Sequence, residues 1–277
     1  MKSIQEIIAL STQYLQERGL TRARRLVEEL LSHVLQCKRL DLYLQFDRPV
    51  EEKELGQMRT HLARIAKGEP IEYVIGHVEF FGVPLQIDPR VFIPRQETEI
   101  LADWVAKRLR GVILWDLCAG SGALGISLKK KLPHLQVTLA DLSREAISLA
   151  QVNAHNNGVE VECLIGDLFA PFEGKQADAV VCNPPYIAER EYPRLSKSVA
   201  DYEPKSALIA GEKGTEVYER LAQEALHHLK SGGQLFLEIG ATQGNVVKEI
   251  FHFPAWSEGE LLLDWSGKDR FFFLEKQ

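Results

Sequence analysis

The chain has 277 residues, of which 45% are hydrophobic and 26% are charged, and it carries a formal net charge of −6. No apolar run approaches the ~20 residues needed to cross a bilayer, and the charged, amphipathic N-terminus does not resemble a signal peptide. The acidic balance argues against a protein that grips nucleic acid over a broad basic surface, because phosphate neutralisation supplies much of that affinity.

The cysteines are scattered and form no Cys-x-x-Cys pair, which argues against a zinc site or a disulfide framework. Reduced thiols in a cytoplasmic protein are the expected reading. The four positions are Cys37, Cys118, Cys163 and Cys182.

Residues 1–69 predict a helical domain. Apolar residues recur at helical spacing in four segments, and no segment reads convincingly as a strand. Thr21 is the expected N-cap of the second helix. The fourth helix is expected over residues 51–67, ending at Gly68 with Pro70 beyond it. We therefore expect a small helical bundle.

Residues 70–95 are aromatic and β-branched and are interrupted by glycine and proline. This pattern predicts a β-hairpin linker in which residues 73–81 pair with residues 83–87.

In residues 96–277 strands alternate with helices, which predicts a parallel, doubly wound α/β sheet. Strands are expected at 112–117, 135–140, 161–165, 177–182 and 234–239, and helices at 122–131, 143–157, 217–229 and 243–251. The chain is expected to end with an antiparallel pair of strands, 258–263 and 270–274.

A glycine-rich loop leaves the first of these strands and enters a helix. Gly120, Gly122 and Gly125 satisfy G-x-G-x-x-G, and Asp141 lies 21 residues after Gly120, so a dinucleotide fits on spacing alone. Asp116, however, would repel a pyrophosphate and suits the positively charged amino acid end of S-adenosylmethionine. The cofactor-binding residues predicted in this loop are Asp116, Cys118, Ala119, Gly120, Ser121 and Gly122.

Two acidic residues follow the next two strands and complete the expected cofactor site. Asp141 ends the second strand and is expected to bind the ribose hydroxyls. Asp167 and Leu168 follow the third strand, where adenine would lie, and Asp167 is a candidate acceptor for the adenine amino group. A helix or turn cap is an equally good interpretation of Asp167.

The tetrapeptide Asn183-Pro184-Pro185-Tyr186 follows the strand at 177–182, at the edge where open α/β sheets bind ligands. The Asn183 side-chain oxygen and the Pro184 carbonyl can each accept one hydrogen of a planar –NH2 group. The prolines restrict the backbone and orient these acceptors, and the Tyr186 ring can lie against a flat substrate. An ordinary strand-to-loop turn is the alternative, because Asn-Pro is common in turns. We predict that all four residues are catalytic and bind substrate, and that Asn183 also contacts the cofactor.

Taken together, these motifs resemble those of the glutamine methyltransferases of peptide chain release factors, the HemK family, over nearly the whole chain. The segments that carry the resemblance are residues 69–76, 92–99, 116–125, 183–186, 202–204, 207–208, 232–240 and 267–270, with Asp141. The tetrapeptide is shared with many amino-group methyltransferases, whereas residues 93–99 and 238–240 make the match specific. Cys118, Gln96 and Leu168 depart from the usual family pattern.

The resemblance implies a seven-stranded, Rossmann-like fold that uses S-adenosylmethionine, behind an N-terminal domain that helps recognise the release factor. The methylated atom would be the side-chain amide nitrogen of the glutamine in a Gly-Gly-Gln loop. Glu238 is a candidate for orienting this glutamine, and a structural hydrogen bond at the strand end is its alternative role.

Two other functions remain open at this point. A methyltransferase acting on the exocyclic amine of a nucleic-acid base would use the same tetrapeptide but would favour a basic channel. A dehydrogenase or a non-catalytic nucleotide-binding module would use the glycine loop alone. Binding of S-adenosylmethionine rather than NAD would distinguish the last two from a methyltransferase.

Overall fold

The computed structural model describes residues 2–277 and divides into two compact units. The first runs from the N-terminus to Gly76 and includes Lys197–Tyr202; the second comprises His77–Ser196 and Glu203–Gln277. None of the helices formed by residues 2–277 has the length and apolar character required to span a lipid bilayer.

The first unit is helical, as expected, and has a core of its own. Its helices are α1 (Ile4–Gln16), α2 (Ala23–Val34), α3 (Arg39–Leu44), α4 (Glu52–Ile65), α5 (Ile71–Ile75) and α9 (Lys197–Ala200). Val27, Leu30 and Leu31 of α2 are fully buried, which is the spacing of one helix face. Ser3 and Glu6 form a capping box at the start of α1.

Two predictions in this region are wrong in detail. Thr21 does not cap α2, because the helix begins at Ala23 after Arg22, whose backbone is left-handed with φ of 58°. The expected first strand of the hairpin begins instead as α5, which buries Tyr73 and ends at Gly76 with φ of 84°. Packing of the β-branched Ile71 and Val74 in the helical core overrides their preference for strands.

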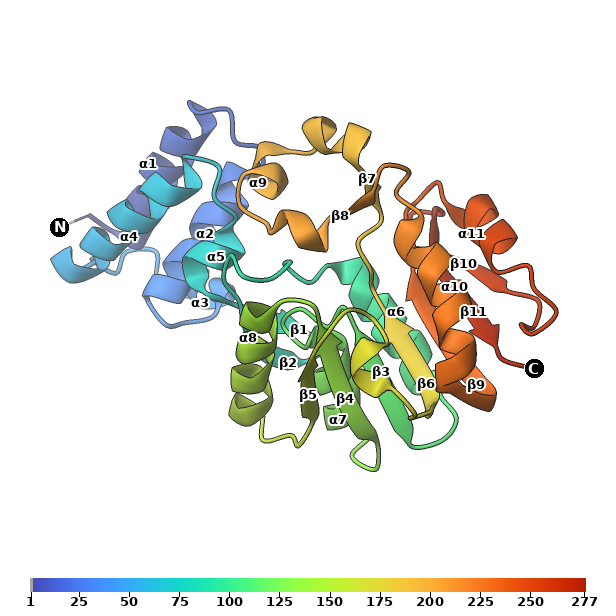
Figure 1. The fold of residues 1–277 in the computed structure, drawn as a ribbon. Helices are drawn as coiled ribbons and strands as arrows, with labels where there is room; N and C mark the ends of the chain where they lie inside the picture. Colours follow the sequence, from blue (N-terminus) through green and yellow to red (C-terminus); the bar gives the residue numbers. More distant parts are fainter. Residues whose placement is uncertain (1) are drawn as a thin grey trace. The chain divides into compact units, whose positions relative to one another are not determined.

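The second unit contains the hairpin, a seven-stranded mixed sheet and a short parallel pair (Figure 1). The hairpin pairs β1 (His77–Phe80) with β2 (Val83–Gln86). The sheet has the order β10-β11-β9-β6-β3-β4-β5, in which β3, β4, β5, β6 and β9 are parallel and β11 pairs antiparallel with both of its neighbours, β9 and β10. Its strands are β3 (Ile113–Leu117), β4 (Gln136–Asp141), β5 (Glu162–Ile165), β6 (Ala177–Cys182), β9 (Leu229–Glu238), β10 (Glu260–Leu263) and β11 (Asp269–Glu275). The predicted sheet and its antiparallel end are confirmed.

Helices cover both faces of this sheet, and each face has its own apolar core. One core includes residues of α6 (Gln96–Arg108), α7 (Ala123–Lys131) and α8 (Arg144–Asn156). The other includes residues of α10 (Glu216–His228) and α11 (Gly244–Ile250). Helix α6 was not among the predicted elements.

The order of the strands determines where a ligand can bind. From β3 the chain continues to β4 and β5 on one side and then returns to β6 on the other. Such a switch point leaves a crevice at the carboxyl ends of the strands. Leu117 of β3 is paired with Cys182 of β6. The glycine loop and the Asn-Pro-Pro-Tyr tetrapeptide therefore leave the sheet side by side.

Candidate active site

The glycine loop combines a tightly packed part with an open part. A Cβ on Gly125 would lie 2.2 Å from Leu139 Cδ2, so glycine is needed where α7 packs on β4. At Gly120, φ is +55° and a Cβ would have no heavy atom of residues 2–277 within 4 Å, apart from those of Gly120 itself and its two chain neighbours. The backbone at Gly120 is therefore open to close approach by a ligand, as a cofactor loop requires.

Asp116 lies beneath this loop and is only 1% exposed. Its Oδ2 accepts the backbone N–H of Gly125, in the first turn of α7, at 2.8 Å. Its Oδ1 is buried and has no hydrogen-bond partner among residues 2–277. Burial is the main reason that the pKa of Asp116 rises to about 7.

This arrangement favours S-adenosylmethionine over a dinucleotide. The N-terminus of a helix normally attracts a phosphate through its free N–H groups. In α7 a carboxylate already accepts one of these N–H groups, so a pyrophosphate would meet like charge. A ligand with a positive charge would instead stabilise the ionised form of Asp116, in which only one carboxylate oxygen has a hydrogen-bond partner, by electrostatic attraction. The residues present therefore fit a sulfonium and ammonium ligand.

Asp141 connects the glycine loop to the end of β4. Its Oδ2 accepts from the backbone of Gly120 and its Oδ1 from the backbone of Ser143, each at 2.8 Å. The backbone of Ala119 donates to Ala140, and that of Gly166 donates to Asp141. Three of the predicted cofactor segments are thus joined by hydrogen bonds. Burial raises the pKa of Asp141, and the hydrogen bonds from the backbone of Ser143 and Gly120 oppose the rise.

Asp167 and Leu168 follow β5, but they face different surroundings. Leu168 is buried in the core under α10, with a left-handed φ of 46°. The Asp167 carboxylate is half exposed, and both its oxygens lie 3.0 Å from Nη1 of Arg220 in α10. Asp167 is therefore an ion-pair partner in this structure, and adenine recognition by its carboxylate remains a prediction. Nothing in the sequence pattern indicated Arg220.

Hydrogen bonds with Thr98 and Gln243 fix the tetrapeptide after β6. Asn183 donates from Nδ2 to Thr98 Oγ1 at 3.2 Å, and Pro184 is buried. Gln243 donates from Nε2 to the carbonyl of Tyr186 at 2.9 Å, which ties the loop to the start of α11. Burial raises the pKa of Tyr186 to about 12, so its hydroxyl is protonated at neutral pH. The loop is thus fixed at both ends.

Glu238 ends β9 directly beside this loop, because Cys182 pairs with Leu237. It is 2% exposed, and its Oε2 accepts from Thr98 Oγ1 at 2.7 Å. Burial is the main reason that the pKa of Glu238 rises to about 7. Glu238 therefore contacts the site through Thr98, a residue that the sequence analysis did not single out although it lies in the family-specific segment 93–99.

Two of the segments that carry the family resemblance are bonded to each other. Glu203 accepts from the backbone of Ile93 at 3.2 Å and forms an ion pair with Arg95. The Glu203 side chain is only 1% exposed, whereas that of Arg95 is 34% exposed. This pair fixes the chain just before α6, the helix that supplies Thr98.

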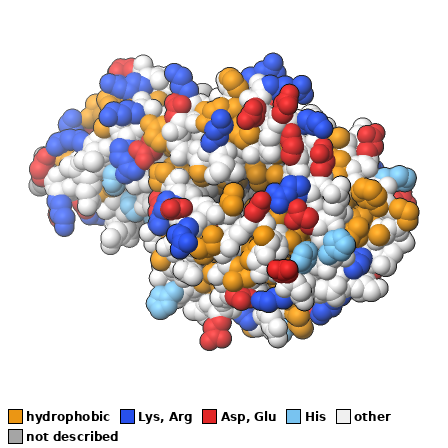
Figure 2. Space-filling model, viewed as in Figure 1, with side chains coloured by type: hydrophobic (Ala, Val, Ile, Leu, Met, Phe, Trp, Pro, Cys, Tyr) orange, Lys and Arg blue, Asp and Glu red, His pale blue; other side chains and the backbone are white. Residues whose placement is uncertain are grey.

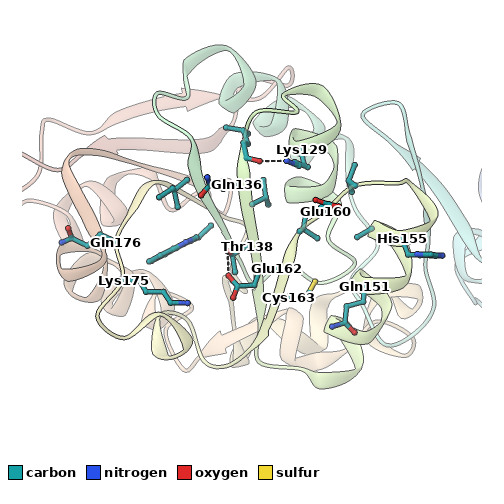
Figure 3. A pocket seen from close by; sticks show the side chains of 17 residues that line it. Lys129, Gln136, Thr138, Gln151, His155, Glu160, Glu162, Cys163, Lys175 and Gln176 are labelled. Carbon is teal, nitrogen blue, oxygen red and sulfur yellow. Dashed lines mark hydrogen bonds between the residues drawn. The ribbon is translucent and has the colours of Figure 1, made fainter.

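A separate hollow of about 930 Å³ lies along β5 and contains none of the predicted site residues (Figure 3). Its lining comes from the amino-terminal halves of the strands and from α8, including Thr138, Glu162 and His155. Thr138 donates to Glu162 at 3.0 Å within it. Ligands of open α/β sheets bind at the opposite, carboxyl ends, so this hollow is not the candidate active site.

Surface charge gives no sign of a nucleic-acid channel on the visible face. There, Lys and Arg side chains of the second unit are interspersed with Asp and Glu and form no continuous basic stripe (Figure 2).

Comparisons with known proteins identify the family. A release factor glutamine methyltransferase of Chlamydia trachomatis serovar L2 is 39% identical over 99% of this chain and 94% of its own length. One of Geobacter sulfurreducens is 36% identical over 97% of this chain and 95% of its own length. This chain belongs to the release factor glutamine methyltransferase family.

Each part of the chain matches a family model of its own. The PrmC N-terminal domain matches residues 6–76, and the methyltransferase small domain matches residues 94–199. A solved methyltransferase from Pyrococcus furiosus superposes with a TM-score of 0.54 over 78% of this chain and 98% of its own length, at 20% identity. That similarity supports the methyltransferase fold. The fold and family expected from the sequence are thus confirmed.

Proposed function

We propose that this protein transfers a methyl group from S-adenosylmethionine to the side-chain amide nitrogen of the glutamine in the Gly-Gly-Gln motif of peptide chain release factors. The observation that carries the proposal is the Asn183–Pro184 acceptor pair. In this chain, which belongs to the release factor glutamine methyltransferase family, the acceptor pair lies beside the open glycine loop at the switch point of the sheet.

The residues proposed to hold the cofactor are those around the glycine loop. The backbone of Gly120 is open to a ligand, and Asp116 supplies buried negative charge. The Asp141 carboxylate is held in place by the backbone N–H groups of Gly120 and Ser143. When bound, S-adenosylmethionine would supply an electrophilic methyl group on a sulfonium sulfur. Leu168 and Asp167 are proposed for the adenine end, which would require Asp167 to share or leave its ion pair with Arg220.

The chain's own contribution is to orient a weak nucleophile. An amide nitrogen shares its lone pair with its carbonyl, so it reacts poorly unless it is held and polarised. In our proposal Asn183 Oδ1 and the Pro184 carbonyl each accept one amide hydrogen, which aims the nitrogen and favours density on it. Positioning of this kind is worth several kcal/mol. The same acceptors stabilise positive charge that develops on the nitrogen.

The N-terminal helical unit is proposed to recognise the release factor. Its helices bury their apolar faces in a core of their own, and none of the residues proposed for methyl transfer lies in it. The proposed boundaries are residues 1–69 for this domain, 70–95 for the linker and 96–277 for the catalytic domain.

The proposal is tested with the purified full-length protein and labelled S-adenosylmethionine. It is offered, in separate reactions, a release factor, ribosomal RNA and DNA. We expect label only in the release factor, and mass spectrometry should locate one methyl group on the glutamine. A release factor in which asparagine replaces that glutamine is the matched control and should stay unlabelled.

Other outcomes would overturn the proposal. Labelling of RNA or DNA but not of the release factor would identify a methyltransferase for nucleic-acid bases. Thermal stabilisation by NAD and not by S-adenosylmethionine would contradict the assignment of the glycine loop.

A further inference from the structure

A buried chain of hydrogen bonds runs behind the tetrapeptide. Asn183 Nδ2 donates to Thr98 Oγ1 at 3.2 Å, and Thr98 Oγ1 donates to Glu238 Oε2 at 2.7 Å. Thr98 is 3% exposed and Glu238 is 2% exposed. The three residues come from the loop after β6, the first turn of α6 and the end of β9. The Thr98–Glu238 bond is therefore made away from bulk water and the Asn183–Thr98 bond is partly shielded from it, which strengthens both relative to water.

This chain has only one consistent direction when Glu238 is ionised. A carboxylate can only accept hydrogen bonds, so it takes the single proton of the Thr98 hydroxyl. The Thr98 oxygen can then only accept, and its partner on Asn183 must be the –NH2 end of the amide. The Oδ1 end of Asn183 is consequently turned away from Thr98.

We propose that Thr98 and Glu238 are positioning residues that set the orientation of the Asn183 amide, so that its oxygen and not its –NH2 group faces the amide to be methylated. This inference rests on the proposed function. A flipped Asn183 would present a donor to a substrate –NH2 group, and two donors cannot bond. The orientation of one amide therefore decides whether the site accepts the nucleophile.

The constraint depends on the charge of Glu238. Arg270 of β11 and Arg95 before α6 face Glu238 with positive charge, Glu97 faces it with negative charge, and Tyr186 and Tyr218 lie nearby. Burial outweighs the two arginines and raises the pKa of Glu238 to about 7. A protonated Glu238 can donate to Thr98, whose own proton is then free to be donated to Asn183 Oδ1, so either end of the Asn183 amide can face Thr98. Turnover should therefore fall as the pH falls through about 7.

The first experiment measures kcat and KM for whichever amino-group substrate the wild-type protein methylates, at saturating S-adenosylmethionine. Thr98→Val keeps the shape and removes the hydroxyl, so kcat should fall ~100-fold, the loss typical of one preoriented partner. KM should change much less. Thr98→Ser restores the hydroxyl and should recover most of the rate.

A double-mutant cycle separates positioning from a structural role. In an Asn183→Ala background, Thr98→Val should cause no further loss of kcat, because both residues act as one unit. Additive losses, or a Thr98→Val protein that melts early but turns over normally once folded, would overturn the inference.

The charge of Glu238 is tested by the pH profile of kcat. Glu238→Gln cannot ionise, so the part of the fall in kcat below about pH 7 that Glu238 causes should disappear, and kcat should stay near the low-pH value of the wild type. Asp116 also has a pKa near 7, but it titrates in both proteins, and the difference between them isolates Glu238. Identical profiles would contradict the inference.

A readout without substrate keeps this test independent of the proposed function. The side-chain –NH2 resonances of Asn183 should shift with an apparent pKa near 7 in the wild type and should not do so in Glu238→Gln. If the release factor is not methylated but this titration is present, the proposed function fails and the inference stands. If the release factor is methylated and the titration is absent, the proposed function stands and the inference about Thr98 and Glu238 fails.

Discussion

Asn183 is the residue on which turnover should depend most. Asn183→Ala should lower the rate of methyl transfer by about 10²–10³-fold, because one preoriented acceptor is worth ~3–4 kcal/mol of barrier. Most affinity for S-adenosylmethionine should remain. Asn183→Asp keeps an acceptor and should retain part of the activity. Single-turnover methylation of a release factor, with calorimetric titration of S-adenosylmethionine, measures both effects.

The melting temperature of Asn183→Ala separates an effect on methyl transfer from an effect on folding. Asn183→Ala removes only one hydrogen bond to Thr98, so the melting temperature should fall little. Transfer by the alanine variant at the wild-type rate would show that the tetrapeptide is only a turn.

In the glycine loop between β3 and α7, cofactor binding should depend on the open space at Gly120 and not on backbone strain. Gly120 and Gly158 have similar left-handed φ angles, +55° and +64°, and neither has a heavy atom of residues 2–277 near its Cβ position. Alanine at either position should therefore cost a similar ~1–2 kcal/mol of stability. Only Gly120→Ala should also weaken S-adenosylmethionine binding, because its methyl group would occupy the space proposed for the cofactor.

Urea unfolding and calorimetry of the two variants check this prediction. Gly158 lies just after α8, away from the glycine loop, and so provides a matched control for strain alone. Equal cofactor affinity in Gly120→Ala, Gly158→Ala and the wild type would contradict the placement of the cofactor over Gly120.

At the scale of the whole molecule, we expect the second unit to bind the cofactor and the helical unit to recognise the release factor. Each has its own apolar core, so deletion of residues 1–76 should leave cofactor binding intact. S-adenosylmethionine at a hundred times its dissociation constant should still stabilise the protein by about 2.7 kcal/mol. Methylation of an intact release factor should fall tenfold or more, equivalent to ~1.4 kcal/mol or more of lost recognition.

A short Gly-Gly-Gln peptide is the control for this deletion. The truncated and full-length proteins should methylate the peptide at similar rates, because it lacks the rest of the release factor surface. Full activity of the truncated protein on the whole release factor would remove the recognition role from the helical unit.

The sequence by itself determined the features that depend on neighbouring residues. The alternation of apolar runs predicted the strands and helices of the sheet, because burial of one face imposes its period on the chain. The glycine loop and the tetrapeptide were recognisable because their chemical groups lie next to one another in the chain. Even so, the predicted strand at Tyr73 became helix α5, because tertiary packing overrode local preference.

Only the tertiary structure decided which groups orient the site. Thr98 is 85 residues from Asn183 and 140 from Glu238, yet one hydroxyl bonds both. Arg220 reaches Asp167 across 53 residues. No local pattern encodes such pairs, because they arise from the order of the strands, which brings β6 and β9 side by side, and from the packing of α6 and α10 against the sheet. The burial that raises the pKa of Glu238 is likewise a property of the folded molecule, since a free chain would leave that carboxylate in water.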